Sequence, residues 1–308
     1  MAWAKPLLLP VLLTCLLPGC AAMQQQDKSS TAVLEKQIER QQEAYRLREE
    51  PERKEKLSAT EYERIGDRHL RGNDINRAYF YYVKALSETP DNPGLLHKQG
   101  GLLLKKKKFV EAEQVYTKLL SISNKDAAAH EGLGRALIGQ DKTAEAEKAF
   151  HAAVALDDAS WQSHHFLGLI YSGREQYEKA AVELKRALSL KPQEHSVLNN
   201  LAVTYCLLGQ YEQAESILRN LAAATKDKKT YNNLAVVYVR LGRYDEALNA
   251  FKKGAKSESA AYYNMGVEYM ANEKYPEAIA AFEQAIALHP QYYPAAATNL
   301  ERAKKALQ

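Results

Sequence analysis

The chain has 308 residues, of which 46% are hydrophobic and 26% are charged, a composition typical of a soluble folded protein. With only 15 glycines, 10 prolines and 3 cysteines, collagen and a disulfide scaffold are excluded and disorder throughout the chain is disfavoured. The formal net charge of +4 is too small over this length to indicate a protein that binds nucleic acid.

The N-terminal residues have the pattern of an export signal. An apolar run over residues 7–17 follows Lys5 and is too short to cross a bilayer, which takes about 20 residues. Residues 17–20 read LPGC, which resembles the lipobox of bacterial lipoproteins. The resemblance implies a signal peptide over residues 1–19, a lipid anchor on Cys20 and, because Ala21 follows, the periplasmic face of the outer membrane. The alternative is an ordinary secreted protein in which Cys20 is incidental.

Residues 20–58 are expected to form a polar tether. They are rich in Gln, Glu, Lys and Arg and have few apolar side chains, so they cannot form a hydrophobic core. We expect this segment to hold the folded part of the chain off the membrane.

The rest of the chain is one repeated unit. The units start at residues 59, 93, 127, 161, 195, 228 and 259, and the last two intervals are shorter than the others by one and three residues. A small residue recurs at the eighth position of each unit: Gly66, Gly100, Gly134, Gly168, Ala202, Ala235 and Gly266. The twentieth position is alanine in every unit, and the twenty-fourth is large and apolar or aromatic.

Each unit has the pattern of two packed helices. Large residues at the fourth, seventh and eleventh positions lie on one face of a helix with about 3.6 residues per turn. Two helices pack closely only where small residues admit the crossing, which explains the glycine and alanine positions. Since the sequence has no strand signature, the pattern predicts an all-α fold.

This unit resembles the tetratricopeptide repeat (TPR). The resemblance covers residues 59–292 and implies a superhelical solenoid of seven helix-turn-helix repeats. Residues 293–308 are predicted to form a C-terminal capping helix whose inward face consists of Ala296, Leu300, Ala303 and Leu307.

The sequence contains no motif for catalysis or metal binding. His130 and His164 occupy the fourth position of their repeats and are expected to be buried between helices. Cys206 is expected to be a packing residue rather than a reactive thiol. The lysines of residues 105–108 are expected to form a solvated turn, with contact to an acidic partner as the alternative. We therefore predict no enzyme, no cofactor, no metal site and no small-molecule substrate.

The resemblance also implies a concave groove formed by the first helix of each repeat. In the family, residues at the fifth and sixth positions tend to face this groove, and asparagine at the sixth can hydrogen-bond to the backbone of a bound peptide. The residues at these positions that we expect to bind a protein or peptide are His165, Asn199, Asn200, Asn232, Asn233 and Asn264. Arg240, at the thirteenth position, can supply a positive charge for a carboxylate. The alternative is that the asparagines bridge neighbouring helices.

A lipobox followed by tandem repeats resembles the small lipoproteins that assist pilus and secretion machines. This implies a membrane-anchored periplasmic adaptor that binds a protein or peptide partner in its groove. Two alternatives stay open: a permanent structural subunit of an envelope complex, and an accessory factor of a cell-wall or polysaccharide enzyme.

Overall fold

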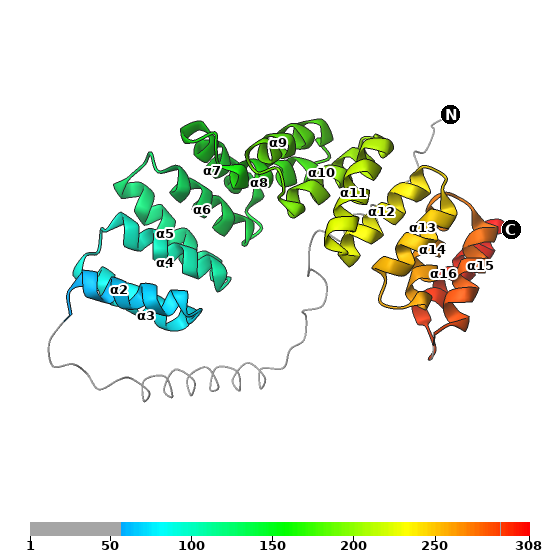
Figure 1. Cartoon of the computed structure of the whole chain (residues 1–308), viewed down its shortest axis with the longest axis horizontal. Helices are drawn as coiled ribbons and strands as arrows, with labels where there is room; N and C mark the ends of the chain where they lie inside the picture. The colour runs from blue at the N-terminus through cyan, green and yellow to red at the C-terminus, as the bar shows by residue number, and fades with distance from the viewer. Residues whose placement is uncertain (1–56, 290) are drawn as a thin grey trace. The chain divides into compact units, whose positions relative to one another are not determined.

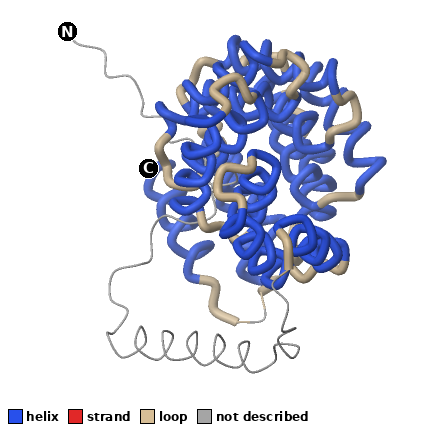
Figure 2. Tube along the Cα trace, turned by 90° about the vertical axis from the view of Figure 1, so that its left-hand side faces the viewer, coloured by secondary structure: helices blue, strands red, loops and turns tan. Residues whose placement is uncertain are grey.

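The computed structural model describes residues 57–289 and 291–308, and every regular element among them is an α-helix. Figure 1 shows these helices following one another along the chain, and Figure 2 shows only helix and loop in this part. The prediction of an all-α fold is confirmed. The expected signal peptide, Cys20 and the tether up to residue 56 lie outside the described residues. No helix of the described part combines the length and hydrophobicity needed to cross a membrane.

The described helices form seven hairpins and one final helix. The first helices of the hairpins are α2 Ala59–Arg71, α4 Pro93–Lys105, α6 Ala127–Ile138, α8 Trp161–Gly173, α10 His195–Leu207, α12 Lys228–Arg240 and α14 Glu258–Ala271. The second helices are α3 Ile75–Glu88, α5 Phe109–Ile122, α7 Thr143–Leu156, α9 Tyr177–Leu190, α11 Tyr211–Thr225, α13 Tyr244–Gly254 and α15 Tyr275–Ala287. The final helix, α16, spans Pro294–Leu307 and buries Ala296, Leu300 and Ala303. Leu307 is 54% exposed at the end of this helix, so the prediction that it faces inward was wrong. Seven helix-turn-helix repeats and a C-terminal helix are therefore present, as predicted.

Local sequence explains where the first helices begin. In six of the seven, a side-chain oxygen just before the helix accepts a hydrogen bond from a backbone N–H of the first turn, which satisfies a group with no partner inside the helix. These capping residues are Ser58, Asn92, Asp126, Ser160, Asp227 and Ser257. The exception is α10, the first helix of the fifth repeat, which follows Glu194 and has no such bond.

A residue in the left-handed conformation lies in the turn of every hairpin, at the fifteenth position of each repeat. Its φ angle lies between 56° and 74°. The seven residues are Asn73, Lys107, Asp141, Glu175, Gly209, Gly242 and Glu273. Lys107 belongs to the basic run of residues 105–108, and Lys108 in the same turn binds Glu111 at 3.2 Å. The basic run is therefore a turn, as expected.

Each hairpin closes around one large side chain of its second helix. A Cβ atom at Gly66 would lie 2.6 Å from the ring of Tyr82, and a Cβ atom at Gly266 would lie 2.6 Å from the ring of Phe282. The small residue at the eighth position therefore makes room for the large residue at the twenty-fourth. The twentieth-position alanines, such as Ala180, are fully buried at the same crossing.

The structure confirms the expected burial of only one of the two histidines at the fourth position. His130 is only half-buried, and its Nε2 atom lies 3.1 Å from the backbone oxygen of Asn124, so the prediction of burial between helices was wrong for this residue. His164 is buried, with 4% of its surface exposed.

The interval before the seventh repeat is three residues shorter than the usual 34, and these residues are missing from the second helix of the sixth repeat. This helix, α13, has 11 residues, whereas α7 and α9 have 14.

Candidate functional site

The candidate groove residues lie on one surface of the first helices. We call the surface formed by the fifth, sixth, ninth and thirteenth positions of these helices the first-helix surface. In six of the seven repeats, the fifth-position side chain hydrogen-bonds to the next repeat, to the residue that caps the first helix of the next repeat, or to α16. These pairs are Glu63 with Lys98 at 2.7 Å, His97 with Asp126 at 2.7 Å, Glu131 with Ser160 at 2.9 Å, His165 with Asn200 at 2.8 Å, Asn199 with Asn233 at 2.9 Å, and Tyr263 with Asn299 at 3.2 Å.

Asn199 and Asn233 are bonded to each other and almost fully buried. The Asn233 amide donates to Asn199 Oδ1 at 2.9 Å, and the two residues are 7% and 8% exposed. A buried amide pair of this kind joins α10 to α12 and satisfies polar groups that would otherwise lack partners. For these two residues, the geometry favours the bridging interpretation over direct contact with a ligand.

Asn200 and His165 form a second pair that stays partly open. The Asn200 amide lies 2.8 Å from His165 Nε2, and both residues are half-buried. Burial lowers the pKa of His165, which favours the neutral ring whose Nε2 accepts this hydrogen bond. Asn200 is therefore oriented by His165, while its side-chain oxygen has no hydrogen-bond partner among the described residues and can accept one from a ligand.

Asn232 and Asn264 differ from the other asparagines. Asn232 Oδ1 is buried and has no hydrogen-bond partner among the described residues. It faces Gly254 at the end of the short helix α13, where a Cβ atom would lie 2.3 Å from this oxygen. Asn264 is half-buried, and its side chain makes no hydrogen bond within the part of the chain that the structure describes. Of the asparagines at the fifth and sixth positions, Asn264 has the most freedom to bind an external group.

Arg240 lies on the same face of α12 as Asn233, two helical turns further on. Its Nη1 donates to Asn272 Oδ1 at 3.2 Å, and its Nη2 lies 3.9 Å from Glu268 Oε2. Glu268 and Asn272 were not predicted, although the sequence held a usable signal: Glu268 is at the tenth position, which is buried in five of the other six repeats.

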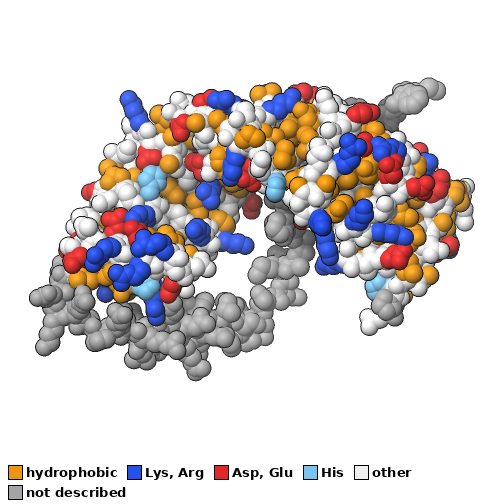
Figure 3. Space-filling view, in the orientation of Figure 1, with side chains coloured by type: hydrophobic (Ala, Val, Ile, Leu, Met, Phe, Trp, Pro, Cys, Tyr) orange, Lys and Arg blue, Asp and Glu red, His pale blue; other side chains and the backbone are white. Residues whose placement is uncertain are grey.

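Between the asparagines, the first-helix surface of repeats five to seven is apolar. The ninth position is valine in all three repeats: Val203, Val236 and Val267. Figure 3 shows positive and negative side chains intermixed on the face that it presents, rather than a field of one sign. This strip carries amide groups and one charged side chain, that of Arg240, so it suits the main chain and apolar side chains of a partner protein better than it suits a polyanion.

The first four repeats have a different first-helix surface. Lys98, at the sixth position, bonds to both Glu63 and Asp67 at 2.7 Å. Phe166, at the same position of the fourth repeat, stacks on Phe150 with ring centroids 5.0 Å apart. Ion pairs and packed rings involve these positions, so asparagines at the fifth and sixth positions occur only in repeats five to seven.

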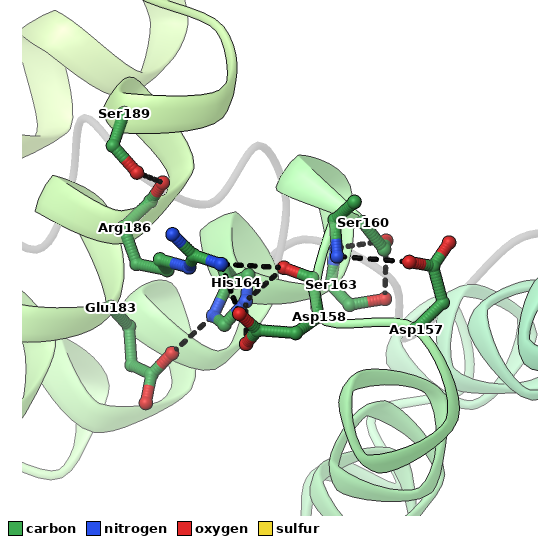
Figure 4. Close-up of polar contacts among 9 residues, drawn as sticks. Asp157, Asp158, Ser160, Ser163, His164, Glu183, Arg186 and Ser189 are labelled. Carbon is green, nitrogen blue, oxygen red and sulfur yellow. Dashed lines mark hydrogen bonds and ion pairs between the residues drawn. The ribbon is translucent and has the colours of Figure 1, made fainter.

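His164 is buried and contacts acidic side chains. Its Nδ1 lies 2.7 Å from Glu183 Oε2, and its Nε2 lies 3.2 Å from the backbone oxygen of Asp158. Arg186 forms an ion pair with Asp158 from the neighbouring helix, as Figure 4 shows. These contacts tie α8 to α9 and to the preceding turn. Among the described residues, no group of three potential metal ligands lies close enough together to hold an ion.

Cys206 is buried and 8% exposed, as expected for a packing residue. Burial raises the pKa of its thiol to about 11, which keeps it protonated at neutral pH.

Stacked helix hairpins with small residues at each crossing define a helical-repeat protein of the solenoid class. Four models of the tetratricopeptide repeat match the chain, over residues 103–163, 162–194, 193–257 and 259–292. The matched segments together cover more than half of the chain, which therefore belongs to the tetratricopeptide repeat family. Proteins of this family are generally scaffolds rather than enzymes.

Several solved structures share the fold. A tetratricopeptide repeat protein from Parabacteroides merdae is 18% identical, with a TM-score of 0.56 over 80% of this chain and 98% of that one. The C-terminal part of a repeat protein from Cytophaga hutchinsonii is 16% identical, with a TM-score of 0.57 over 80% and 99%. PilW, a widely conserved type IV pilus biogenesis factor, is 21% identical, with a TM-score of 0.57 over 63% and 91%. At these identities the similarity shows the fold alone. No curated protein matches the chain.

Proposed function

We propose that this chain is a membrane-anchored periplasmic adaptor that binds an extended stretch of a partner protein on the first-helix surface of repeats five to seven. The observation that carries the proposal is the set of unused amide groups there. Among the described residues, no group hydrogen-bonds to the side-chain oxygen of Asn200 or to the side-chain amide of Asn264. An amide offers both hydrogen-bonding functions, so such residues can bind a main chain without reading its side chains.

The valines beside the amides support the same function. Val203, Val236 and Val267 line the strip one turn away from the asparagines, so a bound segment would meet amide groups and apolar surface together. Peptide recognition commonly combines main-chain hydrogen bonds with apolar contacts.

We further propose that the partner belongs to a pilus or secretion machine, and that Cys20 carries the lipid anchor. The support is the LPGC sequence at residues 17–20 and the shared fold of PilW. Replacing Cys20 with Ser should release the protein from the membrane fraction of the cell. Retention of Cys20→Ser in the membrane would contradict the anchor.

The test of peptide binding is a double substitution, Asn200→Ala with Asn264→Ala. After crosslinking in cells, we expect recovery of the captured partner to fall by roughly tenfold, on the order of 1.4 kcal/mol of binding free energy. The control is Asn220→Ala with Asn249→Ala, which removes two exposed amides from the second helices α11 and α13. Circular dichroism of both variants checks that the helices are intact. Equal recovery with the two double variants would remove the proposal.

A second candidate, a permanent structural subunit, is favoured by apolar side chains on the second helices. Val110 is 54% exposed on α5 and Val182 is 64% exposed on α9. Exposed apolar residues on a repeat protein can mark a packing surface. A permanent subunit should stay with its partners through washing that strips a transient adaptor, which size-exclusion chromatography of the solubilised protein measures.

A further inference from the structure

Lysines gather at the edge of the molecule where the sixth repeat begins and ends, and we call this region the lysine edge. Three of them lie in or just before the first turn of α12, and the others lie in or just after the last turn of α13. All are exposed, and none belongs to the first-helix surface. The lysine edge consists of Lys226, Lys228, Lys229, Lys252, Lys253 and Lys256.

The two groups of lysines are brought together by close contact between the ends of the hairpin. A Cβ atom at Gly254, near the end of α13, would lie 2.8 Å from the backbone oxygen of Lys228. Lys253 Nζ lies 5.7 Å from the centre of the Tyr231 ring, which is one turn into α12. Because residue 254 has no side chain, the end of the short helix α13 can approach the start of α12 this closely.

The lysine edge holds as much net charge as the whole chain. Residues 226–230 and 252–258 contain six lysines and two carboxylates, which gives a net charge of +4. The complete chain of 308 residues also has a net charge of +4, so the charges of all other residues cancel. Like charges repel one another over about 10 Å at physiological salt, so gathering them on one edge does not stabilise the fold. The gathering therefore points to a role in binding.

Carboxylates of the described residues leave most of this charge unpaired. Lys252 Nζ lies 2.7 Å from Glu258 Oε1, and it is the only lysine of the edge with an ion pair in the part of the chain that the structure describes. Asp227 accepts hydrogen bonds from the backbone N–H and the hydroxyl of Thr230, at 2.9 and 3.1 Å. Its carboxylate therefore caps α12. Five ammonium groups stay available for anions from outside the chain.

The chemistry of the lysine edge favours a membrane surface over a partner protein. Protein interfaces are enriched in aromatic residues and arginine and depleted in lysine. The edge contains no arginine, and no large apolar side chain is exposed among the described residues 183–287. Lysine is a compact, hydrated charge on a flexible stem, which suits attraction to many separate phosphate groups. Clusters of about four to eight basic residues bind anionic lipid surfaces in this way.

We propose that the lysine edge binds a membrane surface rich in anionic phospholipid headgroups. The ammonium groups and the headgroup phosphates have opposite charges, and the attraction needs no fixed geometry. This contact is separate from the proposed lipid on Cys20 and from the proposed binding of a partner by Asn200 and Asn264. It would hold the sixth repeat with the start of α12 and the end of α13 toward the lipid.

The test is co-sedimentation of the purified full chain, carrying Cys20→Ser so that no lipid can be attached, with two kinds of vesicle. One kind is phosphatidylcholine alone, and the other contains about one third phosphatidylglycerol. We expect the chain to bind the anionic vesicles about tenfold more tightly, and to lose this preference in about 0.5 M salt. The combination Lys228→Gln, Lys229→Gln and Lys253→Gln should weaken binding to the anionic vesicles about tenfold.

The matched control also removes three exposed lysines, by Lys125→Gln, Lys148→Gln and Lys305→Gln, and should keep the preference. Circular dichroism checks that both triple variants are folded. Equal binding to the two kinds of vesicle, or an equal loss in the two triple variants, would overturn the proposal. Binding of polyglutamate without binding of the anionic vesicles would also overturn it, in favour of an acidic partner protein. None of these results bears on the proposed binding of a partner by Asn200 and Asn264.

Discussion

At the scale of single residues, Glu268 links stability to pH. Burial raises its pKa above the ordinary value of 4.5, so the folded chain holds this proton more tightly than the unfolded chain does. As the pH rises above 4.5, the unfolded chain releases the proton first, and the free energy of unfolding falls. We predict that Glu268→Gln is more stable than the wild type by a margin that grows toward neutral pH. Urea unfolding at several pH values measures this margin, and a constant margin would contradict the account.

A left-handed glycine gives a second prediction at this scale. Gly209 has a φ of +74°, and no atom lies within 4 Å of the position that a Cβ would take. The cost of a side chain there is therefore conformational, on the order of 1 kcal/mol for Gly209→Ala. The control is Gly173→Ala at the end of α8, where the space is also open and alanine favours the helix. If urea unfolding shows the same change in stability for both variants, the turn does not require glycine.

At the scale of helices, the Asn199–Asn233 pair joins two neighbouring repeats. Either single substitution to Ala leaves a buried amide group without its partner, which costs about 1–3 kcal/mol. We predict that the double variant costs less than the sum of the single variants, with a coupling of about 1 kcal/mol. Chemical denaturation of the four proteins measures this coupling. Additive effects would mean that the two amides act independently.

The crossing within a hairpin gives another prediction. Ala180 is fully buried at the twentieth position of the fourth repeat, where α9 crosses α8. Replacing it with Leu should overpack the crossing and cost about 1–3 kcal/mol, visible as a lower melting temperature. An unchanged melting temperature for Ala180→Leu would contradict the packing described for the hairpins.

The limits of the sequence are also clearest at this scale. His130 and His164 share the fourth position, and their difference in burial follows from a residue on the second helix of each hairpin. Glu183 meets His164, whereas the equivalent residue in the third repeat is Ala149, which offers no hydrogen bond. The apolar pattern of a single helix does not reveal such a partner, because the partner lies on another helix. The bond between Asn199 and Asn233 likewise depends on the register of two separate helices.

At the scale of the whole molecule, the repeat spacing was enough to predict the fold. One large residue at the twenty-fourth position fills the space above a small residue at the eighth, as Phe282 does above Gly266, and this pairing recurs in sequence at a nearly fixed interval. The site was predictable only in outline. Asparagine at the sixth position marks the surface, but its free and bridged members differ only through contacts between repeats.

The central claim is that repeats five to seven present a partner-binding surface on their first helices. The most direct test is a photo-crosslinking amino acid placed in cells at position 267 on α14, compared with position 182 on the second helix α9. The account predicts a covalent adduct with a partner protein from position 267, reduced by Asn200→Ala with Asn264→Ala, and none from position 182. An adduct from position 182 alone would contradict it and would favour a subunit that packs through its second helices.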